Sequence, residues 1–361
     1  MNSADSFSAS YDQARAKFIE AVKAADGALE KIAHPERGPD GKDLSTDVAW
    51  WGPRDAQRVL VMISGTHGVE GYCGSGAQID WLRRGEIATV PKGTGILMIH
   101  AVNPYGFAWD RRVTEDNVDL NRNWIDFAHA LPENRDYASL SDAICPSDWS
   151  EGSQQKTTGA LMQFAADRGM PALQQAISGG QYTHPKGVFF GGTGPTWSRK
   201  TQTAVFKSYL GKSAKVAIID YHTGLGPWGY AEQIVPLARE SEAYKRAGQW
   251  FGAAITSPVS GTSTSADIKG DGLSAAIDLL SHAEVTCVAL EVGTMPTMVV
   301  IQALRADAWL HAYGDPRSPE GRTIKKEIRA AFYGDADDWK GMVAGQSLLA
   351  CRQALSGLQR G

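Results

Sequence analysis

The residues best suited to chemistry form the sequence His67-Gly68-Val69-Glu70, directly after the apolar run at 58–63. This short β-branched run, followed by Ser64-Gly65-Thr66, is typical of a buried strand that ends in a Gly-rich loop. Histidine and glutamate three positions apart on such a loop can face one point, and both are ligands of Zn²⁺. Because a catalytic zinc has three protein ligands and one open position, the sequence predicts a third ligand elsewhere in the chain.

Three further apolar runs also lead directly into polar residues. The run at 95–100 precedes Asn103-Pro104-Tyr105-Gly106, the run at 215–220 precedes His222, and the run at 285–290 precedes Glu291. Ligands of open α/β sheets bind at the carboxyl ends of the strands. We therefore expect these polar residues to lie near one another, although an HxxE pair alone also fits a loop histidine beside a solvated glutamate.

A second dense polar cluster spans residues 117–124, with the sequence NVDLNRNW. Such a cluster can be a surface turn with a helix cap. Arg122, however, stands among amide side chains and beside the apolar Val118 and Trp124, which indicates a partly buried guanidinium. A buried arginine usually faces a carboxylate, because its planar fork of donors matches the two carboxylate oxygens.

Together these blocks resemble, in type and in order, the zinc metallocarboxypeptidase family, the carboxypeptidase A-like enzymes. They comprise His67xxGlu70, Asn103-Pro104-Tyr105-Gly106, Arg112, VDLNRNW at 118–124, His222 and Glu291, between about residues 58 and 296. The chain looks most like a poorly characterised bacterial branch of that family, known only as a domain of unknown function.

The resemblance implies a zinc site with Zn²⁺ as the cofactor. His67, Glu70 and His222 match the family's zinc ligands, and Asp119 matches the carboxylate that orients the first histidine. This last role is also expected physically, because a metal-bound imidazole usually donates its other N–H to a carboxylate or a carbonyl group.

The resemblance also implies a hydrolytic mechanism. Glu291 matches the general base, which moves a proton from water to the leaving amine. Arg112 matches the arginine that polarises the scissile carbonyl and stabilises the oxyanion. Asn121 and Arg122 match the pair that binds the terminal carboxylate of the substrate. An error of one residue in the register would exchange Arg112 for Arg111.

The chain departs from the family pattern in the loop before the base. The family carries a tyrosine there, whereas residues 261–281 contain none, and Tyr230 is a distant candidate. Closure over the substrate, and the substrate itself, can therefore differ from those of the family. Asp267, Lys269 and Asp271 in this loop could line a specificity pocket or decorate the surface.

The alternation of strands and helices predicts an α/β fold with a mixed, mainly parallel central sheet flanked by helices, and the resemblance makes it zinc carboxypeptidase-like. We expect a single domain over residues 1–361, with an N-terminal helical extension at about 8–33 and an irregular insertion at about 133–200. The extension begins at Ser10, which fits a capping box with Gln13. Two helices separated at Gly334 should end the chain.

Several other polar and aromatic residues have weaker interpretations. The Gly-rich segment 189–197 lacks the phosphate-binding patterns and is expected to cover the substrate. Trp124 and Trp197 are the two tryptophans expected near the cleft. His100 and His282 are interpreted as packed or solvated histidines rather than metal ligands.

The composition restricts the class of function. With 361 residues, 43% of them hydrophobic and 21% charged, the chain is an ordinary globular protein. The net charge of −4 gives no reason to expect nucleic acid or an anionic membrane surface. The sequence shows neither a transmembrane span nor a signal peptide. The cysteines at 73, 145, 287 and 351 lack CxxC spacing, so we expect free thiols in a cytoplasmic protein.

Three functions fit these residues. The first is zinc-dependent hydrolysis of an amide bond next to a free carboxylate, most simply by a carboxypeptidase acting on small peptides. The second is a deacylase of N-acyl amino acids, like the aspartoacylase and succinylglutamate desuccinylase relatives, which share HxxE and a DLNR-like block and favour small acidic substrates. The third is a zinc-binding protein without turnover. Glu291 argues against the third, because binding alone needs no general base. The sequence indicates no particular oligomeric state.

Overall fold

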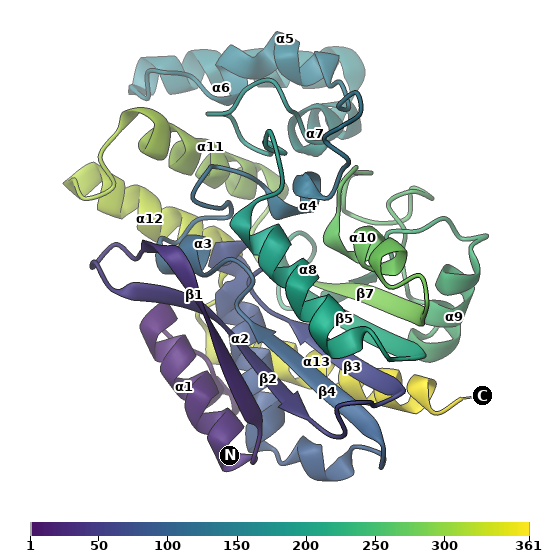
Figure 1. Cartoon of the computed structure of the whole chain (residues 1–361). Coiled ribbons are helices and arrows are strands. Elements are labelled where there is room, and N and C mark those ends of the chain that lie inside the picture. Colours follow the sequence, from purple (N-terminus) through teal and green to yellow (C-terminus); the bar gives the residue numbers. More distant parts are fainter. Residues whose placement is uncertain (1, 361) are drawn as a thin grey trace.

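The computed structural model describes residues 2–360 and is built around one seven-stranded mixed sheet (Figure 1). Across the sheet the strands are β1 (Ala28–Arg37), β2 (Asp43–Trp51), β4 (Thr94–His100), β3 (Arg58–Ile63), β5 (Lys215–Gly224), β7 (Glu284–Gly293) and β6 (Ala231–Ile234). The four strands β4, β3, β5 and β7 are parallel. The strands at the two sides pair antiparallel. The predicted mixed sheet with a parallel centre is confirmed.

The parallel strands form the centre of the core because their side chains are apolar on both faces. In β3, Val59 to Ile63 are at most 1% exposed. Four helices cover one face of the sheet, namely α1 (Tyr11–Ala24), α2 (Gly71–Arg83), α9 (Glu242–Phe251) and α13 (Asp337–Leu358). Two helices cover the other face, namely α8 (Trp197–Leu210) and α10 (Gly272–Leu279). A parallel sheet buried on both faces is the usual arrangement in α/β proteins.

The remaining helices are concentrated beyond the carboxyl ends of the parallel strands, in the upper part of Figure 1. They are α3 (Pro104–Ala108), α4 (Leu120–Asn123), α5 (Arg135–Ile144), α6 (Glu151–Arg168), α7 (Met170–Ser178), α11 (Thr297–Tyr313) and α12 (Pro319–Phe332). Three short 3-10 helices complete the elements, namely η1 (Ser3–Ser6), η2 (Gly68–Glu70) and η3 (Glu86–Thr89). The break between α12 and α13 contains Gly334, as predicted.

The N-terminal segment differs from the prediction of one helix over about 8–33. Ser10 caps α1 by accepting a hydrogen bond from the Gln13 N–H, as expected, but the helix ends at Ala24. Asp26 has a positive φ of 53°, which turns the chain away from the helix. The following residues form β1, which pairs with β2. Leu29 and Ile32, which fit the helical period, are therefore strand residues.

The segment 133–200 is more regular than predicted. Helices α5, α6 and α7 occupy most of it, and α8 begins at Trp197. The apolar side chains of α5, α6 and α7 pack with those of α11 and α12 in one cluster, which includes Tyr137, Leu161 and Ile177. Each of these helices turns only a narrow apolar face to its neighbours, so the sequence pattern underestimates their regularity.

All four cysteines are free thiols, as predicted. Within residues 2–360, no helix combines the length and the apolar character that a membrane crossing requires.

A buried ion network joins the α11–α12 hairpin to the loop after α3. The Nε of Arg111 donates to the Asp307 carboxylate on α11 at 3.0 Å, and Lys325 on α12 binds the same carboxylate. Arg111 and Asp307 are each 3% exposed. Burial opposes ionisation, but Lys325 and Arg111 outweigh it and hold the pKa of Asp307 below its ordinary range. The network keeps the hairpin against the loop that carries Arg112.

We expect Asp307→Asn to lower the free energy of unfolding by about 3–5 kcal/mol, because it leaves two buried cations without their counter-charge. Urea unfolding followed by circular dichroism measures the change. The matched control is Asp126→Asn, whose carboxylate is 65% exposed beside an exposed histidine. It should leave the midpoint unchanged. Equal midpoints for Asp307→Asn and the wild type would show that the network contributes nothing to stability.

Candidate active site

The predicted site residues gather at the carboxyl ends of three neighbouring parallel strands. His67 follows β3, His222 lies near the end of β5, and Glu291 lies near the end of β7. The register of β5 and β7 places His222 directly beside Glu291. Glu70 ends η2, immediately before α2. The expectation that polar residues of distant segments share one edge of the sheet is therefore met for these four.

The HxxE loop lies against the loop that contains both arginines. The N–H of Gly68 donates to the Arg112 carbonyl at 3.1 Å, and the N–H of Val69 donates to the Arg111 carbonyl at 2.8 Å. A Cβ on Gly68 would lie 2.0 Å from the Gly106 carbonyl carbon, so only glycine allows this approach. The two loops are thus held together by their main chains.

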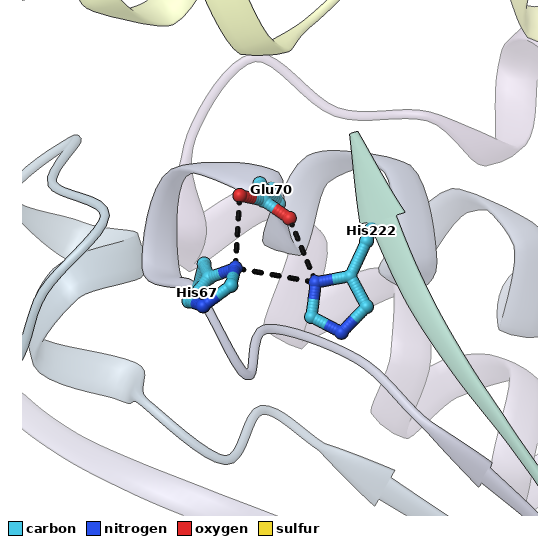
Figure 2. A group of neighbouring side chains, drawn as sticks. All are labelled: His67, Glu70 and His222. Atoms are coloured by element: carbon cyan, nitrogen blue, oxygen red, sulfur yellow. Dashed lines mark hydrogen bonds and ion pairs between the residues drawn. The ribbon is translucent and has the colours of Figure 1, made fainter. Parts of the chain in front are cut away.

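His67, Glu70 and His222 converge on one point (Figure 2). The Nδ1 atom of His67 lies 3.0 Å from Glu70 Oε1, and the Nδ1 atom of His222 lies 3.0 Å from Glu70 Oε2. The two Nδ1 atoms are 3.2 Å apart. All three side chains are at most 5% exposed.

A carboxylate lies behind each imidazole ring. The Nε2 atom of His67 is 3.1 Å from Asp119 Oδ1, and the Nε2 atom of His222 is 3.0 Å from Asp220 Oδ2. Both carboxylates are buried. If each ring carries its proton on Nε2, toward its carboxylate, both Nδ1 atoms present lone pairs to the point that Glu70 faces.

This donor set fits a metal ion. Three acceptor atoms so close together repel one another unless a proton or a metal ion lies between them. Burial lowers the pKa of His222, but Asp220 and Glu70 outweigh it and raise that pKa well above the ordinary value. The site therefore favours positive charge, and a metal ion would compete with protons for it. Two histidines and a glutamate are a ligand set that zinc takes in catalytic sites.

Sequence reasoning missed Asp220. It precedes His222 by two residues on β5, and its carboxylate also accepts a hydrogen bond from the Thr66 hydroxyl at 2.9 Å. Side chains at positions i and i+2 of a strand point to the same face. That spacing is the signal in the sequence that could have identified Asp220 as the partner of His222.

Glu291 lies beside this cluster and is held from the other side by the main chain. Its Oε1 atom accepts a hydrogen bond from the Leu225 N–H at 3.0 Å. Burial in the cleft and the nearby Glu70 raise the pKa of Glu291 to about 7, against the opposing effect of His222 and Arg112. A carboxyl group with such a pKa can take up and release a proton near neutral pH.

The structure distinguishes the two adjacent arginines. Arg112 faces the cluster: its Nη1 donates to Glu70 Oε1 at 2.7 Å, and its Nε donates to Asp119 Oδ2 at 2.9 Å. Arg111 points away, to Asp307 and Asn117. Of these two arginines, only Arg112 lines the cleft that lies above the cluster. The residue chosen from the family pattern is thus the one whose guanidinium lies at the site.

Asn121 and Arg122 also border the cleft, but part of their hydrogen-bonding capacity is used inside the protein. Arg122 donates from Nη1 to the Asn121 carbonyl at 3.0 Å and from Nη2 to the Ser178 carbonyl. Within residues 2–360 its buried Nε has no hydrogen-bond partner. The Asn121 side-chain oxygen accepts from the Gly272 N–H at 3.0 Å. A guanidinium has five N–H donors, so Arg122 retains donors for a ligand.

The cleft above the cluster has about 1000 Å³ of empty space, part of which is open solvent, and its walls are mainly apolar. Its walls come from α7, α11, α12 and the segment 258–273. Phe189 of the Gly-rich segment lines it, whereas Trp124 and Trp197 do not. Trp197 instead packs edge-on against His34, because it begins α8 on the outer side of the loop. The expectation is therefore wrong for Trp197, whereas Trp124 lies near the cleft, because its indole adjoins Gly272 between the cleft-lining Asp271 and Leu273.

The positions of five further residues test the remaining predictions for this region. Of the three charged residues of the loop before the base, Asp271 lines the cleft, but Asp267 and Lys269 do not. Tyr230 is 48% exposed and lies outside the cleft lining, so the family's tyrosine has no replacement there. His100 is buried against Phe18 and hydrogen-bonded to Ser75, as expected for a packed histidine.

Comparisons with known proteins identify one family model that matches the chain and several solved structures of low sequence identity. A family model described as a protein of unknown function (DUF2817) matches residues 7–346. No curated protein matches the chain. Among solved structures, carboxypeptidase A from Helicoverpa armigera shares 12% identity at a TM-score of 0.44, over 90% of this chain and 74% of that one.

Two further solved structures represent other hydrolases. A putative succinylglutamate desuccinylase/aspartoacylase family protein from Shewanella amazonensis shares 16% identity at a TM-score of 0.35, over 79% of this chain and 71% of that one. Murein-tripeptide amidase MpaA from Escherichia coli O157 shares 15% identity at a TM-score of 0.33, over 84% of this chain and 95% of that one. Likenesses of this size say nothing about the activity of this chain. The family model confirms the expectation that the chain belongs to a family known only as a domain of unknown function.

We expect purified protein to bind about one divalent metal ion per chain, because the two histidines and Glu70 offer three ligands and leave one position open. His67→Ala and His222→Ala should each lose the ion, as measured by elemental analysis after dialysis. His129→Ala, whose ring is 80% exposed, is the control and should keep it. Full metal content in both ligand variants would place the ion elsewhere.

Proposed function

We propose that this chain, which belongs to the family described as a protein of unknown function (DUF2817), is a zinc-dependent hydrolase that cleaves an amide bond next to a free carboxylate. One observation carries the proposal. The Nδ1 atoms of His67 and His222 converge with Glu70 on one point, and both histidines line a cleft that also contains a carboxylate of raised pKa, Glu291.

The mechanism assigns the proton transfers to Glu291. A zinc ion held by the three ligands would act as a Lewis acid on the carbonyl and lower the pKa of water. Glu291 would take the proton from the attacking water and deliver it to the leaving amine, for which its pKa near neutrality is suited. The Leu225 N–H holds the other side of this carboxylate in place.

The two arginines of the cleft would have separate tasks. Arg112 is fixed by Glu70 and Asp119 and keeps further N–H donors for the oxygen that becomes negative during attack. Arg122, with Asn121, would bind the carboxylate of the substrate. Each of its two Nη atoms donates to one main-chain carbonyl and has a second N–H for this task.

A carboxypeptidase acting on small peptides is the simplest form of this activity. The mainly apolar lining of the cleft would also accommodate the second candidate, a deacylase of N-acyl amino acids, because an acyl group can pack against it. A zinc-binding protein without turnover would have no use for Glu291. Metal analysis combined with turnover of a library of peptides and N-acyl amino acids tests the three against one another.

We expect Glu291→Gln to keep the fold and the metal but to lose about 10²–10⁴-fold in kcat, because glutamine is nearly isosteric and cannot accept the proton. The control is Glu284→Gln, at the start of the same strand and partly exposed, which should retain full activity. Turnover by Glu291→Gln at the wild-type rate would mean that Glu291 is structural and that another group is the base.

We expect the wild type to cleave a substrate with a free carboxylate at least about 30-fold better in kcat/KM than the matched amide. An unpaired member of a buried charge pair costs about 2–5 kcal/mol, and about 1.4 kcal/mol corresponds to tenfold. Arg122→Ala should remove most of this preference. Arg122→Lys, which keeps the charge without the fork, should retain part of it.

The measurement compares the three proteins on both substrates, with circular dichroism to verify the fold. If the wild type cleaves the amide as fast as the acid, the substrate class implied by the family does not apply to this chain.

A further inference from the structure

The cleft has two walls that differ in polarity and in what they adjoin. One wall consists of residues of the segment 265–273 and borders the proposed carboxylate site, since the Gly272 N–H binds Asn121 and the Trp124 N–H binds the Gly270 carbonyl. The other wall, which we call the α11 wall, consists of five buried side chains: Phe189, Val300, Ile301, Leu304 and Phe332.

The α11 wall adjoins the residues proposed for catalysis. Phe189 lies under two guanidinium groups, with its ring centroid 5.3 Å from Cζ of Arg112 and 5.2 Å from Cζ of Arg122, so it forms the part of the wall nearest the proposed carboxylate site. Leu304 lies with Phe189 and Arg112 around a small adjoining cavity. Phe332 lies at the end of β5: a Cβ placed on Gly224 would be 3.1 Å from its ring and 3.8 Å from Glu291 Oε1. The wall therefore faces the scissile bond from the side of Arg112 and Glu291.

The α11 wall carries no charged side chain, and its five members belong to one hydrophobic cluster. Of the two arginines over Phe189, Arg112 is paired with both Glu70 and Asp119, and Arg122 is the residue proposed to bind the carboxylate of the amino acid. A second carboxylate placed against Val300 and Ile301 would lose its hydration without gaining a partner, whereas a hydrocarbon group would gain by leaving water.

A second cavity continues the cleft beyond this wall. It is bordered by Met170, Pro171, Leu173 and Met298, and it shares Gln174, Thr297 and Ile301 with the cleft. These three shared side chains separate the two spaces. Ile301 is the apolar one of the three, and it thus marks the far end of the α11 wall.

We propose that the α11 wall is a binding site for an uncharged, apolar acyl group, and that the preferred substrates are N-acyl amino acids with such a group rather than with an acidic one. This inference rests on the proposed function. It assigns the amino acid carboxylate to Arg122 and the acyl chain to the part of the α11 wall formed by Val300, Ile301 and Leu304. Ile301 then sets the length of the chain that fits.

The test uses N-acyl derivatives of one amino acid, the best leaving group in the library, with acetyl, butanoyl, hexanoyl, octanoyl and succinyl groups. Butanoyl and succinyl have the same number of carbon atoms and differ in the terminal carboxylate. We expect butanoyl to exceed succinyl by at least about 30-fold in kcat/KM (about 2 kcal/mol). From acetyl to butanoyl we expect a gain of about fourfold for each methylene group (about 0.8 kcal/mol).

Ile301→Ala tests the end of the wall. It should connect the cleft with the second cavity and move the preferred acyl group to a longer member of the series. Met298→Ala, which borders only the second cavity, is the matched control and should leave the preference unchanged. The acetyl substrate, which is too short to reach Ile301, reports whether each variant retains a folded site.

Binding of the same compounds to Glu291→Gln, measured by calorimetry, separates this inference from the proposed function. If butanoyl binds better than succinyl but the wild type hydrolyses none of the series, the apolar site stands and the hydrolase is wrong. If the wild type hydrolyses butanoyl and succinyl equally, or prefers succinyl, the hydrolase stands and the apolar acyl site is wrong. Absence of any binding overturns the site.

Discussion

Two imidazole rings face each other through their Nδ1 atoms at 3.2 Å, and the structure around them depends on holding this contact. Each ring is held from behind by a buried carboxylate, and Glu70 faces both from the side. Such an arrangement is costly without a cation at its centre, since it concentrates acceptors and negative charge in the core. The sheet makes it possible, because its parallel strands bring β3 and β5 to the same edge.

The central fold and most of this constellation could be predicted from the sequence because both depend on local signals. Short apolar runs followed by polar residues indicate buried strands, and parallel strands place their carboxyl ends together. His67, His222 and Glu291 therefore had predictable neighbours. Cysteines without regular spacing were correctly expected to be free.

Other parts could not be predicted because they depend on contacts between distant segments. Nothing in the local pattern of Leu29 and Ile32 separates a helix from an edge strand, and the turn at Asp26 decides between them. The direction of Arg111 is set by Asp307 on α11, almost two hundred positions away, and that of Arg112 by Glu70 and Asp119. The cleft walls from α7, α11 and α12 likewise arise from packing among helices whose apolar faces are narrow.

The single carboxylate of Asp119 interacts with several residues of the site. It accepts from His67 and from Arg112, its Oδ1 also accepts from the Asn121 N–H, and it lies 3.8 Å from Arg122. A ligand that draws Arg122 toward itself would change the charge that Asp119 presents to His67. Coupling free energies are reciprocal, so in the proposed enzyme the cation would alter substrate affinity by the same factor as the substrate alters cation affinity. Retention of the cation and occupancy by the substrate would then depend on each other, so that a measured change in one would report a change in the other.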